Sequence, residues 1–166
     1  MPFRCFAYGS NMFTAKMQVP APSATFVTTG RVAGYLFRFN KQSDDGSGKG
    51  NLFPTGSQAD VVWGVVFEIA DAERERVDQS EGGYVPITMG IDTSNGPLSV
   101  VTYIAKPNRV NNALGPYTWY KDFVVRGAED HELPPAYIAQ IVAVPSVADP
   151  DAAREKRQRA LLKSRG

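Results

Sequence analysis

Residues 6–12 read FAYGSNM, an apolar run that ends abruptly in a glycine, a hydroxyl and an amide. The segment RCFAY (4–8) has the composition of a short β-strand, so the chain leaves a strand through a small polar turn. Such a turn is either a plain connection or a place where main-chain N–H groups face a ligand. Asn11 is a plausible N-cap for one or two helical turns over NMFTAKM (11–17).

Strand patterns dominate the first two-thirds of the chain. ATFVTTGRVAGYLFRFN (24–40) is rich in β-branched and aromatic residues and is interrupted by Gly30 and Gly34, and DVVWGVVFEI (60–69) also carries an internal glycine. Glycines inside strands are typical of bulges and of the sharp bends found in barrels. The segment 84–106 reads as two strands on either side of SNGP, which predicts a hairpin.

Helical patterns follow one of these strands and fill the last third of the chain. ADAERERVDQSEG (70–82) predicts a helix in which Asp71 caps the start, Glu73 suits the first turn and Gly82 suits the stop. From about Tyr117 onward the pattern is helical. This segregation predicts an α+β protein, with a small, strongly bent mixed β-sheet or barrel and flanking helices.

The length of 166 residues fits one domain, which we expect to span 1–148, followed by a basic C-terminal helix or tail over 149–166. The segment REKRQRALLKSRG (154–166) holds six basic side chains and one acidic side chain. We interpret this segment as a solvated terminal helix, since it lacks the interleaved aromatics of a nucleic-acid-binding segment. Attraction to nucleic acid or to an anionic surface is the alternative reading.

The sequence does not support a membrane span, a secretion signal, a zinc site or a phosphate loop. No apolar run approaches the roughly 20 residues of a membrane span, and the first residues lack a signal-peptide pattern, so a cytoplasmic protein is expected. Cys5 and His131 are the only cysteine and histidine, too few for a usual Cys/His zinc site. DDGSGKGN (44–51) does not match a phosphate loop, and we expect 41–50 to form a mobile surface loop. We therefore expect no cofactor and no metal.

Glu81 is the acidic residue for which the sequence gives the strongest evidence of a catalytic role. It falls at the predicted C-terminal end of a helix, where the macrodipole disfavours the charged form and raises the pKa of a carboxyl group. A glutamate with a raised pKa is a suitable general base near neutral pH, while a surface glutamate at a helix stop is the simpler reading. Gly82 and Gly83 follow it and allow close approach of a backbone or ligand. Cys5 paired with His131 is a weaker candidate, because mid-strand Cys5 is explained by core packing.

Together, five segments resemble the γ-glutamylcyclotransferase family in the broad sense that includes avirulence-induced-like and butirosin-pathway members. The resemblance runs in order from Phe6 to about Tyr137. The segments that carry it are FAYGSNM, GRVAGYLFRFNK, VVWGVVFEI, VDQSEGGY and YKDFVVRGAEDHELPPAY.

The resemblance implies that the α-amine of a γ-glutamyl amide attacks its own γ-carbonyl, which gives 5-oxoproline and a freed amine without a cofactor or a metal. Glu81 matches the family's catalytic glutamate, Tyr120 matches a tyrosine that contacts substrate, and Tyr84 is a weaker candidate. The substrate loop of the family matches the quoted turn. The implied substrate-binding residues are Phe6, Ala7, Tyr8, Gly9, Ser10, Asn11, Tyr84 and Tyr120.

The sequence leaves the leaving group open, because γ-glutamyl amino acids, γ-glutamyl amines and isopeptides share the same reacting half. Two other classes of function are alternatives. One is a non-catalytic binding module for a carboxylate-bearing metabolite, and the other is a nucleic-acid- or membrane-associated protein that uses 154–166. An intact Glu81 favours the enzyme, because a binder of an anionic glutamyl group gains nothing from another buried negative charge. The sequence does not indicate an oligomeric state.

Overall fold

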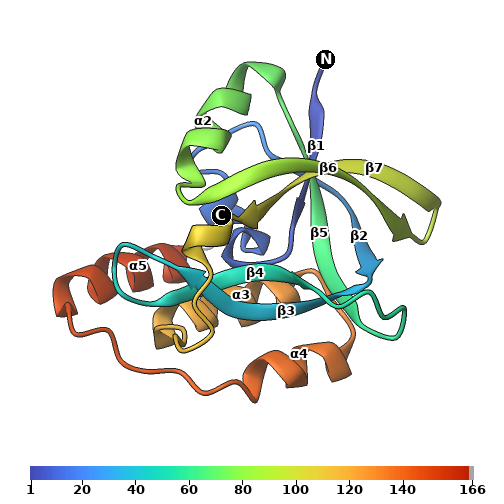
Figure 1. Ribbon diagram of the computed structural model, residues 1–166. Coiled ribbons are helices and arrows are strands. Elements are labelled where there is room, and N and C mark those ends of the chain that lie inside the picture. Colours follow the sequence, from blue (N-terminus) through green and yellow to red (C-terminus); the bar gives the residue numbers. More distant parts are fainter. Residues whose placement is uncertain (165–166) are drawn as a thin grey trace.

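A computed structural model describes residues 1–164, and in it five strands close into a small barrel flanked by helices (Figure 1). The order around the barrel is β1-β5-β2-β6-β7, and β1 runs parallel to β7 while the other neighbours are antiparallel. The predicted α+β class with a mixed barrel is therefore confirmed. The strands are β1 (Phe3–Ala7), β2 (Thr25–Ala33), β3 (Tyr35–Gln42), β4 (Gly48–Pro54), β5 (Val61–Ile69), β6 (Tyr84–Thr93) and β7 (Gly96–Ala105).

Glycines let the barrel close at the positions where the sequence predicted bends. Gly30 of β2 lies opposite Gly64 of β5. A Cβ atom on Gly64 would lie 2.5 Å from the carbonyl oxygen of Ala7, so no larger residue fits where β5 crosses β1. Gly34 has a φ of +91°, which only glycine adopts easily, and it divides the predicted run 24–40 into β2 and β3.

The segment 41–50 is not the mobile loop that its composition predicted. β3 and β4 pair as a separate two-stranded sheet as far as Gln42 and Gly48, and only the five residues between them form the connection. Asp45 organises this connection, because its carboxylate accepts hydrogen bonds from the backbone N–H and the hydroxyl of Ser47. The hydroxyl of Tyr117 donates to the carbonyl oxygen of Asp45 at 2.6 Å. These hydrogen bonds hold the polar residues of the connection in place, which the composition of the segment does not indicate.

Two predicted helix caps are wrong. Asn11 lies within a 3₁₀ turn (Ser10–Met12) that starts after Gly9, and its side chain makes no cap. A 3₁₀ turn (Asp71–Glu73) precedes α2 (Arg74–Ser80), and Asp71 makes no side-chain cap at its start either. The carboxylate of Glu73 instead accepts hydrogen bonds from the backbone N–H and the hydroxyl of Ser23, which ties this turn to the segment before β2.

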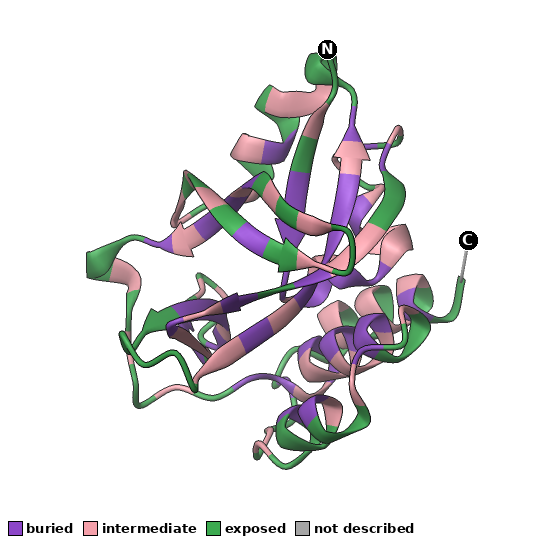
Figure 2. Ribbon diagram, turned by 90° about the vertical axis from the view of Figure 1, so that its right-hand side faces the viewer, coloured by how far each residue is buried: buried purple, intermediate pink, exposed green. Residues whose placement is uncertain are grey.

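The helices of the last third cover one side of the strands, and buried residues concentrate where strands and helices meet (Figures 1 and 2). Gly127 of α3 allows the closest approach, because a Cβ there would lie 2.6 Å from the backbone of Met12. The rings of Phe13 and Phe123 pack edge to face beside it, with centroids 5.4 Å apart. The remaining helices are α1 (Thr14–Met17), α3 (Thr118–Asp130), α4 (Pro135–Val142) and α5 (Ala152–Ser164).

Within the predicted basic segment 149–166, Ala152–Ser164 form helix α5, which is packed along one face rather than solvated on all sides. The buried carboxylate of Asp149 accepts a hydrogen bond from the indole N–H of Trp119 and pairs with Arg154. Arg159 donates to Asp122 of α3 at 2.9 Å. Residues 165 and 166 of this segment lie outside the described residues. No helix within 1–164 is both long and apolar enough to cross a bilayer.

Candidate active site

The turn after β1 opens into a cavity at one end of the barrel, called the inner cavity below. The space between its lining residues, including open solvent at the mouth, is about 410 Å³. All nine site residues predicted from the sequence line it, together with five that the sequence did not single out as site residues. The predicted residues are Phe6, Ala7, Tyr8, Gly9, Ser10, Asn11, Glu81, Tyr84 and Tyr120, and the additional ones are Cys5, Met17, Gly50, Thr102 and Tyr103.

Glu81 is the residue that ends α2, as predicted, and its carboxylate enters the inner cavity. The side-chain amide of Asn11 donates a hydrogen bond of 2.8 Å to Oε1 of Glu81. This bond joins two predicted site residues that are 70 positions apart in the sequence. The pKa of Glu81 is raised, chiefly because the carboxylate is withdrawn from water, and nearby lysines and the Asn11 bond oppose the rise. A carboxylate so placed can accept and return a proton near neutral pH.

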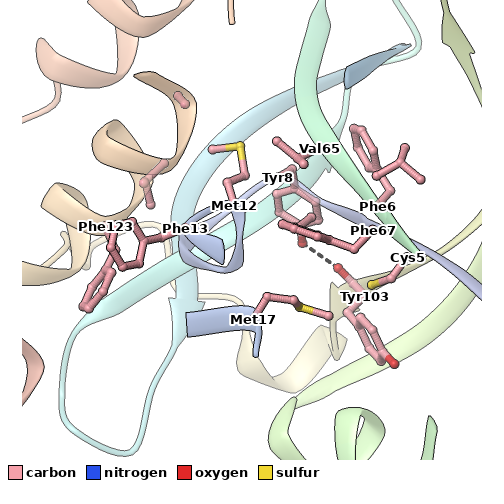
Figure 3. Packing of buried hydrophobic residues seen from close by; sticks show 14 of the residues in the cluster. Cys5, Phe6, Tyr8, Met12, Phe13, Met17, Val65, Phe67, Tyr103 and Phe123 are labelled. Carbon is pink, nitrogen blue, oxygen red and sulfur yellow. Dashed lines mark hydrogen bonds between the residues drawn. The ribbon is translucent and has the colours of Figure 1, made fainter. Parts of the chain in front are cut away.

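One wall of the inner cavity is held by buried hydrogen bonds between β1, β7 and α2. The hydroxyl of Tyr8 donates to the carbonyl oxygen of Tyr103 at 2.5 Å, and both side chains lie in the close-packed cluster of Figure 3. The hydroxyl of Tyr103 donates in turn to Asp78 of α2 at 2.5 Å. Since Asp78 lies one turn before Glu81, this chain of bonds fixes the helix end that carries Glu81.

A second wall is built around the peptide of Gly50. The hydroxyl of Tyr120 accepts the N–H of Gly50 at 2.9 Å, and the hydroxyl of Tyr84 donates to its carbonyl oxygen at 2.7 Å. A Cβ on Gly50 would lie 2.9 Å from the ring of Phe37, so glycine is required for this approach. Tyr84 and Tyr120, both predicted as substrate contacts, therefore also position β4 at the cavity.

The turn itself presents main-chain donors. The 3₁₀ turn satisfies its carbonyl groups, because the N–H groups of Met12 and Phe13 bond to the oxygens of Gly9 and Ser10. The N–H groups of Gly9 and Asn11 find no backbone acceptor within residues 1–164. Both residues line the cavity, so these donors are available to an anionic or carbonyl oxygen there.

A wider depression, the outer basin, continues from the mouth of the inner cavity and shares Glu81 and Tyr120 with it. Three lysines from three different elements line the basin: Lys16 of α1, Lys41 of β3 and Lys49 of β4. Helix α5 closes one side with Gln158 and Leu161. The basin is therefore predominantly cationic, with Glu81 at its boundary with the inner cavity.

The sequence missed these lysines for identifiable reasons. Lys49 belongs to the segment that its composition marked as a surface loop. Lys41 follows Phe37 and Phe39 at intervals of two, but the pairing of β3 with β4 is irregular between Arg38 and Lys41, so this spacing does not identify the face on which Lys41 lies. Lys16 has no sequence signal, because only the tertiary fold brings α1 beside β4.

The other candidate sites from the sequence, a Cys5–His131 pair and a metal site, are not formed by the described residues. Cys5 lines the inner cavity, but burial raises the pKa of its thiol to about 12, so it remains a neutral thiol at physiological pH. His131 instead packs its ring on Phe26 and Phe67 and hydrogen-bonds to Thr14. Among residues 1–164, no group of three or more histidine, cysteine or acidic residues could hold a metal ion.

Comparison with protein families gives a match over residues 61–141 to the AIG2-like family. This segment runs from β5 to α4 and includes Glu81 and Tyr120. The match therefore covers the helix end that carries Glu81 but not the turn after β1.

Comparisons with curated proteins and with solved structures both find similarity to γ-glutamylcyclotransferases. The chain is 29% identical over 144 residues to a bovine (Bos taurus) γ-glutamylcyclotransferase, covering 81% of this chain and 74% of that protein. It is 28% identical over 151 residues to the human (Homo sapiens) γ-glutamylcyclotransferase, covering 86% and 78%. A solved γ-glutamyl cyclotransferase structure superposes with a TM-score of 0.84 at 26% identity, covering 99% of this chain and all of the other.

Proposed function

We propose that the chain, which is similar in sequence and structure to γ-glutamylcyclotransferases, is an enzyme of that type that closes a γ-glutamyl amide into 5-oxoproline and releases an amine or amino acid. The observation that carries this proposal is the meeting of Glu81 with the turn after β1 in one small cavity. The substrate is a small molecule whose γ-glutamyl half lies in the inner cavity. Its leaving half then extends into the outer basin.

The proposed chemistry starts at the α-ammonium group of the substrate. The Glu81 carboxylate removes a proton, and the neutral amine then attacks the γ-carbonyl carbon to close a five-membered ring. The reaction is intramolecular, so the protein needs to hold the reactive conformer, in which effective molarities of about 10⁵ M or more are available. Burial of Glu81 raises its pKa towards the range in which a carboxylate is an effective base.

The developing oxyanion needs hydrogen-bond donors that are already in place. The N–H groups of Gly9 and Asn11 are positioned by the 3₁₀ turn and carry no backbone bond within the described residues. Donors that are fixed before the reaction stabilise transition-state charge without reorganising. Protonated Glu81 then gives its proton to the leaving nitrogen as the bond between that nitrogen and the γ-carbon breaks. The second proton that the ring nitrogen must lose passes through the same carboxylate to the freed amine, which completes the general acid–base role proposed for Glu81.

The domain carrying this site is proposed to comprise residues 1–148, with 149–166 as a C-terminal addition. Leu161 of α5 lies at the outer basin, and Leu162 is buried against the body of the protein. The addition therefore supplies part of the basin rim and none of the inner cavity within the described residues.

The test is release of 5-oxoproline from a γ-glutamyl amino acid by wild-type protein and by Glu81→Gln. We expect wild-type protein to form 5-oxoproline and Glu81→Gln to lose about 10²–10⁴-fold in kcat/KM, the usual contribution of general acid–base catalysis. Glu75→Gln, an exposed exchange on the same helix, is the matched control and should retain wild-type turnover.

Two results would contradict the proposal. Absence of product from folded wild-type protein, combined with tight binding of the γ-glutamyl compound, would favour the binding module. Equal turnover by wild-type protein and Glu81→Gln would keep the reaction but remove Glu81 from its proposed role.

A further inference from the structure

The outer basin is lined by three lysines and two carboxylates, Glu81 and Asp44, and Asp44 is already paired with Arg109 at 3.1 Å. Of its three lysines, only Lys49 has a carboxylate partner, with its ammonium 3.5 Å from Asp45. Neither Lys16 nor Lys41 forms an ion pair within residues 1–164, and neither pairs with Glu81. Two ammonium groups therefore face the basin without an anion.

Lys41 is the more unusual of the two, because it is only 6% exposed. Its Nζ lies 4.8 Å from the ring centroid of Tyr84. A Cβ on Gly83 would lie 2.9 Å from the same Nζ, so the ammonium rests against the chain immediately after Glu81. A buried ammonium without a hydrogen-bonded anion is costly, and such groups are ordinarily paired.

Lys16 lies on α1, which precedes β3 and β4 in the sequence. Its Nζ lies 5.8 Å from the ring centroid of Phe123, and Lys49 lies over Tyr120 at 5.5 Å. Burial, followed by repulsion from Lys49, lowers the pKa of Lys16 to about 8, and the same two causes lower the pKa of Lys41. An anion in the basin would relieve this repulsion and restore the charged form of both side chains.

We propose that the outer basin binds a leaving amino acid that carries two carboxylates, so that the preferred substrates are γ-glutamyl-glutamate and γ-glutamyl-aspartate. This inference rests on the proposed cyclotransfer reaction. The α-carboxylate of the leaving residue supplies one anion, and its acidic side chain supplies the second, which matches the two unpartnered lysines. The Glu81 carboxylate attracts both ammonium groups but forms an ion pair with neither, so both remain available to the leaving residue. A cationic amine as leaving half meets repulsion from all three lysines.

The experiment compares two nearly isosteric substrates, γ-glutamyl-glutamate and γ-glutamyl-glutamine, by 5-oxoproline release. The pair differs only in the charge of the leaving side chain, and γ-glutamyl-alanine reports turnover without that group. In wild-type protein we expect kcat/KM for γ-glutamyl-glutamate to exceed that for γ-glutamyl-glutamine by about tenfold, the order of one charge-assisted hydrogen bond.

Three variants assign the preference to residues. Lys41→Met keeps an apolar side chain of similar length beside Gly83, and Lys16→Gln keeps a similar length on α1. Each variant should lower the ratio of kcat/KM for γ-glutamyl-glutamate to kcat/KM for γ-glutamyl-glutamine towards one. The change should come chiefly from a lower rate with the charged substrate. Lys106→Gln removes an exposed lysine outside the basin and should preserve the wild-type ratio.

The outcomes separate the inference from the reaction on which it rests. Product from both substrates with a wild-type ratio of one or less would overturn the inference and leave the cyclotransferase in place. Lack of product from every γ-glutamyl compound by folded protein would overturn the reaction itself. The ratio of kcat/KM values in wild-type protein decides the inference even if Lys41→Met fails to fold. Lys16→Gln then tests whether the preference comes from the basin lysines.

Discussion

The inner cavity and the outer basin differ in what holds their side chains in place. The inner cavity is walled by strands and by buried hydrogen bonds such as those of Tyr8 and Tyr120. The outer basin is lined by flexible charged chains, Lys16 and Lys41 among them, contributed by elements that pack outside the barrel. The rigid part suits the half of the substrate that reacts, and the charged part suits the half that varies. Catalysis and selectivity can therefore be altered separately.

The largest effect, after the exchange of Glu81, is expected from Tyr120→Phe. The change leaves the N–H of Gly50 without its acceptor and loosens the wall beside the turn. Loss of a partner to a buried donor costs about 1–3 kcal/mol, equivalent to roughly 5- to 150-fold. We expect kcat/KM to fall by such a factor equally for charged and neutral leaving groups, measured by 5-oxoproline release.

Tyr35→Phe is the matched control, because Tyr35 lies on β3 outside both the inner cavity and the outer basin. Tyr120 lines both the inner cavity and the outer basin, so a loss in Tyr120→Phe confined to one leaving group would show that it acts through the basin and would contradict the prediction.

An intermediate effect is expected from Asn11→Ala on the pH dependence of kcat/KM. The amide of Asn11 stabilises the charged form of Glu81, so its removal raises the pKa of Glu81 further. Because the deprotonated carboxylate is the proposed base, activity is expected to fall as pH drops through this pKa. The acid limb should therefore move to higher pH, by about one unit.

Asn95→Ala, at the exposed turn between β6 and β7, should leave the acid limb in place. An acid limb that stays fixed in Asn11→Ala would mean that a group other than Glu81 controls it.

The smallest effect is expected from salt. Raising the ionic strength from about 0.05 M to about 1 M shortens the screening length from roughly 14 Å to about 3 Å, which weakens attraction between the basin and an anionic leaving group. The kcat/KM for γ-glutamyl-glutamate should fall several-fold, while that for γ-glutamyl methylamide changes little. Equal salt dependence for both substrates would contradict a charged basin that selects the leaving group.

Local sequence signals marked the turn and Glu81, whereas the role of Tyr120 and the assignment of the turn as a substrate loop came only from the resemblance to the γ-glutamylcyclotransferase family. The abrupt end of β1 in Gly9, Ser10 and Asn11 marks the turn, and the helix stop marks Glu81. The sequence alone did not show that these two places meet. The hydrogen bond between Asn11 and Glu81 is a product of barrel closure, which brings β1 beside the element that follows β5.

The outer basin could not be predicted in the same way. Its lysines come from α1, β3 and β4, and nothing in their local sequence distinguishes them from surface lysines. Composition was misleading at 41–50, where glycine, serine and aspartate suggested mobility but Asp45 and Tyr117 hold the connection in place. Long-range packing decides such positions, and local patterns do not record it.

The most direct test of this division of roles is the crystal structure of Glu81→Gln with unreacted γ-glutamyl-glutamate bound. The account predicts the γ-carbonyl oxygen within hydrogen-bonding distance of the N–H groups of Gly9 or Asn11, with the leaving glutamate among Lys16 and Lys41. Density for the γ-glutamyl half among the lysines, with the leaving glutamate in the inner cavity, would contradict it.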